Sequence, residues 1–301
     1  MSVKVHEIVT ERIIKALEQG VIPWRMPWRR RGGSGLPKNL QSGKEYRGVN
    51  IFLLGAQGYA SPFWCTYKQC AAKGGQVRKG EKSTPVIFWK VGDHKSKVRK
   101  DGSPEKMFIL RYYNVFNVAQ CDGLDLPEEP KSGEVPTFNP IEECEKIVRA
   151  YKTCPKVDHG GDRACYSPAF DRIHMPHKES FEGPEEYYST LFHEMTHSTG
   201  HTDRLNREEI MRWSGFGSHD YSFEELVAEC GAAFLCAHAG IIDHTLENSA
   251  AYIQSWVRKL KSEPRWIVEA SGKASKAADY IMGDLLKVEE ESDDEAEDAA
   301  Q

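Results

Sequence analysis

A histidine pair four residues apart, with a glutamate directly after the first histidine, constrains this chain more than any other feature. The segment STLFHEMTHSTGH contains the pattern His193-Glu194-x-x-His197. Apolar residues recur at helical spacing around it, which predicts a helix, and positions i and i+4 of a helix lie on one face. The two imidazoles can therefore present nitrogens to one metal ion, with Glu194 placed to act as a general base.

A third metal ligand is expected downstream, where four side chains could supply it. His201 and Asp203 follow the predicted end of the helix at Gly200. Glu225 and Glu229 lie one turn apart in SFEELVAECGAAFLCAHAG, a second predicted helix that is otherwise mostly apolar. An acid in such a helix is costly to bury unless it is paired or binds a metal. The pattern EELVAE resembles the gluzincin arrangement, which implies Glu225 as the ligand and Glu229 as a support for a ligand histidine, with Glu229 or Asp203 as alternative ligands.

Two histidines and a carboxylate are typical ligands of catalytic zinc, and manganese or cobalt can take the same ligands. Tyr221, Tyr166 or His219 could stabilise an oxyanion at such a site, and Tyr221 is kept as the candidate catalytic residue. The segment DRIHMP (171–176) could be an edge strand that binds an extended peptide by β-addition. The pattern therefore predicts peptide hydrolysis in which Glu194 takes a proton from water.

The amino-terminal part of the chain is strongly basic, although the net charge of the whole chain is −5. Residues 1–120 contain 22 Lys and Arg against 8 Asp and Glu, whereas the rest contains 18 against 37. A charge of +14 on one part of the chain predicts a polyanionic partner, and nucleic acid is the most general one. The segment EEESDDEAEDAAQ (289–301) holds eight acids and no base. We expect it to be a solvated, disordered tail.

Tryptophans and arginines alternate in PWRMPWRRRGG (23–33), and more aromatic, basic and amide side chains follow. Aromatic rings stack on unpaired bases while cations neutralise phosphates, so this combination favours binding of single strands. The sequence shows no recognition helix or zinc finger, and we therefore expect sequence-nonspecific binding of single-stranded DNA. The candidate nucleic-acid-binding residues are Trp24, Arg25, Trp28, Arg29, Arg30, Arg31, Lys38, Tyr46, Arg47, Asn50, Trp64, Tyr67, Lys68, Arg78, Lys79 and Lys82.

The order of the predicted helices and strands indicates an α+β protein of two domains. A shift to Pro, Gly and acidic residues after position 120 marks the linker. We expect a single-strand-binding domain at 1–125, a linker at 126–140, a metallopeptidase-type domain at 141–288 and the tail at 289–301. The predicted helices are 3–19, 48–57, 67–73, 141–152, 185–199, 223–238, 248–263 and 273–288, and the predicted strands are 85–91, 107–118, 164–168 and 171–176.

The composition points to a cytoplasmic protein without a membrane partner. No apolar run approaches the ~18 residues that a membrane helix needs. The amino terminus is an amphipathic helix pattern that lacks the apolar region of a signal peptide. The eight cysteines are scattered without a CxxC pair, so we expect reduced thiols rather than a disulfide framework or a zinc ribbon.

Several longer runs resemble a known family. The runs FHEMTHSTGH, FGSHDYSFEELVAECGAAFLCA, AAYIQSWVRKL and ASKAADYI are similar to the zincin metallopeptidases of polyvalent proteins. The runs TERIIKALEQGVIPWRMPW, GVNIFLL, YASPFWCTYKQ and VRKGEKSTPVIFWK are similar to the amino-terminal domain of the ArdC family of antirestriction proteins, which conjugative plasmids carry. Together these runs span most of residues 3–287.

The resemblance implies a domain that binds single-stranded DNA, joined to a zincin-like domain. Zinc would be held by His193, His197 and a downstream glutamate, with Glu194 as the base. The implied role is protection of incoming plasmid DNA from restriction in a bacterial cytoplasm, with a host restriction protein or another protein as the candidate peptide substrate. Two alternatives stay open: a non-catalytic single-strand-binding protein with a structural metal, and a DNA mimic that uses the acidic half of the chain.

Overall fold

The computed structural model describes residues 2–25, 36–98, 104–124, 140–211, 219–241, 250–283 and 285. The protein is α+β, as predicted, and its contacts divide it into two compact units. The first unit contains Met1–Pro23, Pro37–Pro127 and Ile253–Val268, and the second contains Trp24–Leu36, Glu128–Tyr252 and Glu269–Gln301. Two segments thus belong to the unit opposite to the predicted domain: Trp24–Leu36 lies in the second unit, and Ile253–Val268 lies in the first. Most of the predicted linker and all of the predicted tail lie outside the described residues.

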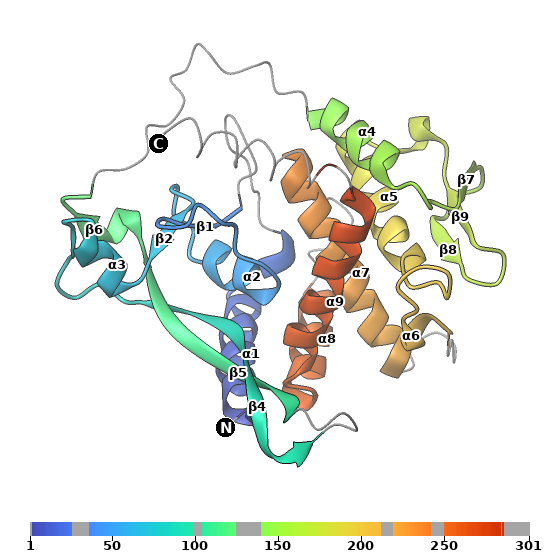
Figure 1. Cartoon of the computed structure of the whole chain (residues 1–301). Helices are drawn as coiled ribbons and strands as arrows, with labels where there is room; N and C mark the ends of the chain where they lie inside the picture. The colour runs from blue at the N-terminus through green and yellow to red at the C-terminus, as the bar shows by residue number, and fades with distance from the viewer. Residues whose placement is uncertain are drawn as a thin grey trace. The chain divides into compact units, whose positions relative to one another are not determined.

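The first unit is built around a four-stranded sheet of order β1-β2-β5-β4. Strand β1 runs parallel to β2, while β5 is antiparallel to both β2 and β4. Figure 1 shows β4 and β5 as a long twisted ribbon. The elements of this unit are α1 (Ser2–Glu18), β1 (Lys38–Asn39), α2 (Val49–Gly55), β2 (Phe63–Cys65), α3 (Tyr67–Ala72), β3 (Gln76–Val77), β4 (Thr84–Val98), β5 (Pro104–Asn117), η2 (Val118–Gln120) and β6 (Cys121–Asp122).

Apolar periodicity explains how the first unit buries its helices. Val5, Val9, Ile13 and Leu17 recur every four residues along α1 and are all buried. They form one face of the helix, which packs against β5 and α2. A second buried cluster joins the sheet to α2 and contains Tyr46, Leu54, Trp64, Val86 and Val115.

The second unit combines helices with a three-stranded sheet of order β7-β9-β8. Strand β9 is central, parallel to β7 and antiparallel to β8. The elements are α4 (Pro140–Ala150), β7 (Lys156–His159), β8 (Cys165–Ser167), β9 (Arg172–Met175), η3 (Lys178–Ser180), α5 (Pro184–Ser198), α6 (Glu208–Met211) and α7 (His219–Ala239). The short helix η1 (Pro23–Arg25), the helix α8 (Ala250–Ser262) and the helix α9 (Trp266–Met282) each contain residues of both units.

Close packing of α5 against α7 brings the predicted metal-binding motif and the acids of the second helix together. Gly231 of α7 faces Thr196 of α5, and a Cβ atom at Gly231 would lie 2.4 Å from the Thr196 side chain. Only glycine therefore permits this approach of the two helices. Helix α7 begins at His219, four residues before the predicted start, and α9 begins at Trp266 rather than Lys273.

Within the described ranges, no helix is both long enough and apolar enough to cross a bilayer.

Candidate metal centre and nucleic-acid surface

Helix α5 supplies both histidines and the glutamate of the predicted motif. It begins with Pro184, a residue suited to the first helical position, and ends at Ser198. His193 and His197 lie one turn apart, with their Nε2 atoms separated by 3.2 Å. The four-residue spacing of the motif thus directs the two imidazole Nε2 atoms toward one point.

Glu225 of α7 completes a group of three metal-ligating side chains. Its Oε2 lies 3.6 Å from His193 Nε2, and its Oε1 lies 3.5 Å from His197 Nε2. Ligand atoms that each stand about 2.1 Å from one tetrahedral ion are roughly 3.4 Å from one another. The three atoms therefore fit a single divalent cation, and the donor set of two imidazoles and a carboxylate suits one chemically.

Glu224, the residue before this carboxylate, supports the other side of His197. Its Oε1 lies 3.3 Å from His197 Nδ1, and Arg207 donates from Nη2 to Oε1 at 2.6 Å and from Nε to Oε2 at 3.0 Å. Glu224 and Arg207 are both buried. Burial opposes the charged carboxylate, but the Arg207 guanidinium outweighs it and holds the pKa of Glu224 below its usual range. The pair orients His197, as a carboxylate behind a ligand histidine commonly does.

The electrostatics of the group favour a positive charge at its centre. Burial alone would lower the pKa of His197, but the carboxylates of Glu224 and Glu225 raise it to about 10. Burial alone would raise the pKa of Glu225, whereas its contacts with His193 and His197 lower it. A proton or a divalent cation can supply this charge.

The group opens into a cleft of about 750 Å³ in the second unit. Glu194 lies on its wall, and the backbone N–H of Tyr166 donates to Glu194 Oε2 at 2.7 Å. This bond fixes the candidate base beside the metal ligands. Tyr221 also lines the cleft, and burial, together with the charge of Glu225, raises the pKa of its hydroxyl.

The structure places the other oxyanion candidates differently. The Tyr166 hydroxyl donates to Asp171 at 2.8 Å and accepts from Arg204 at 3.2 Å, so it is already engaged. Arg204 also binds the Asp171 carboxylate, and this network fixes the turn between β8 and β9. His219 is exposed at the start of α7 and does not line the cleft.

The edge strand of the cleft is β8, which corrects the expectation for residues 171–176. That segment forms the central strand β9, paired on both sides, and has no free edge for a peptide. The β8 residues Cys165 to Ser167 line the cleft and, within the part of the chain that the structure describes, pair only with β9. The free backbone edge nearest the metal ligands therefore belongs to β8.

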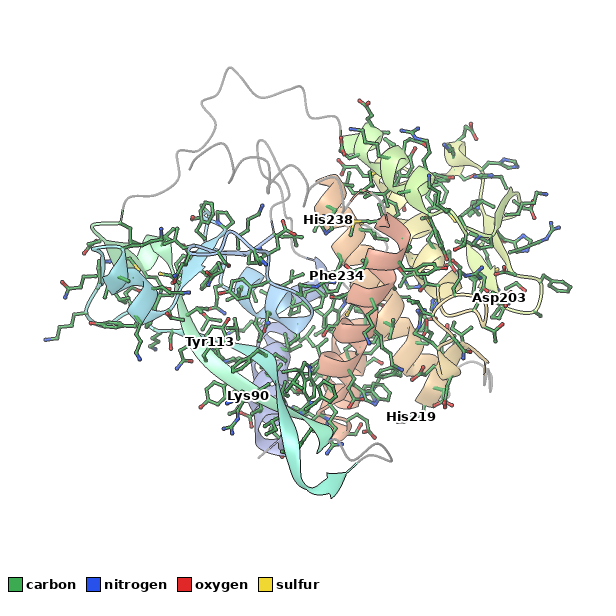
Figure 2. All side chains as sticks on the ribbon, viewed as in Figure 1. Lys90, Tyr113, Asp203, His219, Phe234 and His238 are labelled. Atoms are coloured by element: carbon green, nitrogen blue, oxygen red, sulfur yellow. The ribbon has the colours of Figure 1, made fainter. Side chains whose placement is uncertain are left out.

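Neither alternative after the helix end joins the ligand group. The Asp203 side chain, labelled in Figure 2, is 84% exposed, and its Oδ2 lies 3.6 Å from His201 Nδ1. Gly200, the predicted end of the helix, lies two residues after the end of α5 and does not have a positive φ. A Cβ atom there would meet Ile210 at 2.6 Å and Arg207 at 3.0 Å, so the glycine makes room for the arginine that binds Glu224.

Glu229, the other alternative ligand, is occupied elsewhere. Its Oε2 accepts a hydrogen bond of 2.8 Å from Trp24 Nε1 and another from the Tyr252 hydroxyl. Trp24 is fully buried, so it is not available to stack on a base. The structure thus corrects two expectations. Trp24, predicted to contact DNA, and Glu229, predicted to bind the metal or support a ligand, are hydrogen-bonded to each other inside the second unit.

We expect Trp24→Phe to lower the free energy of unfolding by about 1–3 kcal/mol, because Glu229 then loses a donor in a buried position. Chemical denaturation followed by circular dichroism measures this loss. The affinity of the folded variant for single-stranded DNA should equal that of the wild type. A loss of DNA affinity without a loss of stability would return Trp24 to the nucleic-acid surface.

Three further nucleic-acid candidates have structural roles. Trp64, on β2, and Tyr46, in the loop before α2, are buried in the same apolar cluster. Asn50 forms two hydrogen bonds with the backbone of Ile87, donating at 2.9 Å and accepting at 2.8 Å. These residues hold α2 and the loop before it against the sheet, and the two buried rings cannot stack on a base.

The exposed candidates remain consistent with a polyanion surface. Tyr67 is 58% exposed, and the basic side chains of Arg47, Lys68, Lys79 and Lys82 are exposed as well. Lys38 pairs with Glu45 at 3.4 Å. Arg78 is bound by Glu81, Asp122 and the carbonyl of Ala119. Trp28, Arg29, Arg30, Arg31 and the Arg25 side chain lie outside the described residues.

The β4–β5 ribbon carries aromatic side chains that the sequence reasoning did not select. Phe88, Trp89, Phe108 and Tyr112 are between 41% and 64% exposed. The signal was present in VIFWK and MFILRYY. A strand with one buried face alternates apolar and polar residues, whereas these runs place apolar and aromatic residues at consecutive positions. Trp89, Phe108 and Tyr112 share one face of the ribbon, and Phe88 lies on the other face.

Two family models match the chain. The model of the N-terminal domain of anti-restriction factor ArdC matches residues 3–116, and the model of a zincin-like metallopeptidase matches residues 142–273. The crystal structure of the antirestriction protein ArdC from plasmid R388, in metal-free form, is 37% identical. The similarity covers 94% of this chain and 98% of that one, with a TM-score of 0.73. The chain belongs to the ArdC family.

Other relatives of this ArdC-family chain differ in how much of their length it spans. A Sinorhizobium fredii protein designated y4eC is 38% identical, over 92% of this chain and 91% of that protein. Two Escherichia coli proteins named DNA primase TraC are 37% and 38% identical, but the chain spans only 29% and 20% of their lengths. A Mn(II)-bound structure of R388 ArdC is similar with a TM-score of 0.69, at 38% identity over 92% of this chain and 96% of that one.

Proposed function

We propose that this ArdC-family chain is an antirestriction protein that binds single-stranded DNA, carries a divalent-metal peptidase site and protects incoming plasmid DNA in a bacterial cytoplasm. One observation carries the proposal: the convergence of His193, His197 and Glu225 beside Glu194, in a chain that covers 98% of R388 ArdC at 37% identity. The amino-terminal basic charge of +14 supports the DNA part of the proposal.

The proposed metal ligands are His193, His197 and Glu225. Zinc is the ion that this donor set favours, and cobalt would accept the same ligands. Manganese is a further candidate, because the related ArdC protein of R388 has a Mn(II)-bound structure. A divalent cation held there supplies Lewis acidity to a peptide carbonyl.

The chain's own residues provide the remaining chemistry. Glu194, fixed by the Tyr166 N–H, accepts a proton from the attacking water and returns it to the leaving amine. Tyr221, whose hydroxyl keeps its proton at neutral pH, is the candidate donor to the developing oxyanion. The unpaired side of β8 offers the backbone carbonyl of Tyr166, whose N–H is held by Glu194, to an extended peptide, for which a host restriction protein is the candidate source.

Metal binding should raise thermal stability. Variants of two glutamates on α7 distinguish between the two candidate ligands. At a metal concentration of 100 Kd, we expect a gain of about 2.7 kcal/mol. Glu225→Gln should abolish this gain, whereas Glu229→Gln, its matched control one turn away, should retain it. Thermal denaturation with and without zinc or manganese measures both. If Glu229→Gln loses the gain and Glu225→Gln keeps it, the ligand assignment is wrong.

Single-strand binding should depend steeply on salt. If the strand places about four phosphates on the protein, affinity should fall roughly 50-fold between about 50 and about 200 mM salt. Fluorescence anisotropy with a labelled oligodeoxynucleotide measures the slope. A nearly flat dependence would show that phosphate contacts do not dominate, and the proposed role of the basic unit would be rejected.

The biological role is tested by transfer of an unmodified plasmid into a restricting host. The ratio of transconjugants in restricting and non-restricting hosts should rise when the chain is produced by the incoming plasmid. An unchanged ratio at normal protein levels would reject the antirestriction role.

A further inference from the structure

We infer that a polar cavity in the first unit takes up one unpaired base of the bound strand, which makes binding base-selective at one position. This inference rests on the proposed single-strand binding. The cavity has a volume of about 710 Å³, within the range of sites for small ligands. It lies where β1, the loop after it, α3 and β5 meet, and its lining includes Asn39, Lys44, Tyr46, Arg47, Gln69 and Tyr113.

The cavity contains amide groups of fixed orientation. Asn39 Oδ1 accepts from the backbone N–H groups of Gln41 and Ser42 at 3.0 and 3.1 Å. Gln69 Oε1 accepts from the backbone N–H of Thr66 at 2.8 Å. Since both carbonyl oxygens are held by backbone donors, the amide nitrogens of Asn39 and Gln69 are the groups left to meet a ligand.

Among the described residues, neither amide nitrogen has an acceptor at a normal hydrogen-bond distance. Asn39 Nδ2 is 3.4 Å from both the Tyr46 hydroxyl and Gln69 Oε1, which is long for an N–H···O bond. A ligand acceptor at a normal distance would be a better partner. Asn and Gln amides pair with the edges of bases, and unpaired bases are read in this way by single-strand-binding proteins.

The charges around the cavity suit a base that carries its phosphates. Lys44 and Arg47 are exposed beside it. The acid among the lining residues, Glu45, is paired with Lys38 at 3.4 Å. A cationic margin around a hydrogen-bonding interior matches a nucleotide of a strand better than an apolar or a cationic ligand.

One face of the β4–β5 ribbon extends the cavity into a path for neighbouring nucleotides. Tyr113 of the cavity packs against Phe88, with ring centroids 5.5 Å apart. Phe88 pairs with Arg111, and Lys90, which is labelled in Figure 2, lies two residues after Phe88 on the same face. Phe88, Arg111 and Lys90 are all exposed, so the face alternates a stacking ring with two cations.

The decisive variant is Gln69→Glu. Glutamate keeps the carboxyl oxygen that accepts from Thr66, because Thr-x-x-Glu is an equally good capping box, so α3 should stay intact. The change replaces the amide donor in the cavity by an acceptor. We expect affinity to fall about tenfold for the preferred base and less for the others, which is the size of one lost base contact. Binding of equally long oligomers of dA, dC and dT measures this.

Gln76→Glu is the matched control, because it adds the same charge at an exposed position of β3 outside the cavity. It should bind all three oligomers like the wild type. Arg47→Ala should weaken binding of every oligomer, while Arg12→Ala, an exposed arginine on α1, should not. Circular dichroism shows that each variant is folded.

The outcomes separate this inference from the proposed function. A wild-type chain that binds no oligomer rejects single-strand binding itself. A wild-type chain that binds, with Gln69→Glu and Arg47→Ala unaffected, rejects the cavity alone. Equal losses for Gln69→Glu and Gln76→Glu, or an equal loss for all three bases, reject base reading in the cavity.

Discussion

Glu194→Gln should lower the rate of peptide hydrolysis by about 10²–10⁴-fold, which is the range for loss of a general base. The glutamine keeps the shape of the side chain and can still accept from the Tyr166 N–H, but it cannot take a proton from water. Metal-induced stabilisation and affinity for single-stranded DNA should be unchanged, since Glu194 is outside the ligand group. Hydrolysis of a fluorogenic peptide library measures the rate.

Glu182→Gln is the matched control, because it lies just before α5 and does not line the cleft. It should hydrolyse peptides like the wild type. Hydrolysis by Glu194→Gln at the wild-type rate would reject the assignment of the base. If Glu194→Gln still protects incoming plasmid DNA, protection does not require proteolysis, and a non-catalytic, DNA-binding role replaces the peptidase.

Arg207→Met should destabilise the second unit by about 3–5 kcal/mol, the usual cost of removing one partner from a buried ion pair. Glu224 is 1% exposed, and Arg207 provides its hydrogen bonds together with His197. Without the guanidinium, the carboxylate is buried beside a single imidazole. Chemical denaturation monitored by circular dichroism measures the change.

The exposed Arg163→Met serves as the control and should change stability by less than about 0.5 kcal/mol. The double variant Arg207→Met/Glu224→Leu should recover part of the loss, because it removes the stranded charge. Metal-induced stabilisation of the double variant should still fall, since His197 loses its support. If Arg207→Met alone were as stable as the wild type, the role assigned to this ion pair would be contradicted.

The sequence was sufficient for the class of fold and for the family, since both follow from long runs of residues. The pairing of His193 with His197 also follows from their spacing on a helix. The role of Glu224 could not be predicted in this way. Adjacent helical positions point about 100° apart, so only the packing of α7 on α5 decides which acid faces Nε2 and which faces Nδ1.

Burial was the other property that local sequence could not reveal. A tryptophan followed by an arginine is the same pattern whether its ring stacks on a base or fills a core. Trp24 is buried because its indole meets Glu229, which is 205 positions away in the chain. The exposed aromatics of β4 and β5 were missed for the same reason, since a strand that is covered on both faces reads as the same run of apolar letters.

The hydrogen bond between Trp24 and Glu229 has a consequence for dividing this protein into pieces. A fragment that starts at residue 141 would lack the indole, leaving a hole in its interior and a buried carboxylate with one donor fewer. Such a fragment should express poorly or melt early even if its metal ligands are all present. The second unit is encoded by three separated stretches of sequence, Trp24–Leu36, Glu128–Tyr252 and Glu269–Gln301. Limited proteolysis that cuts between the first two stretches should leave them bound together.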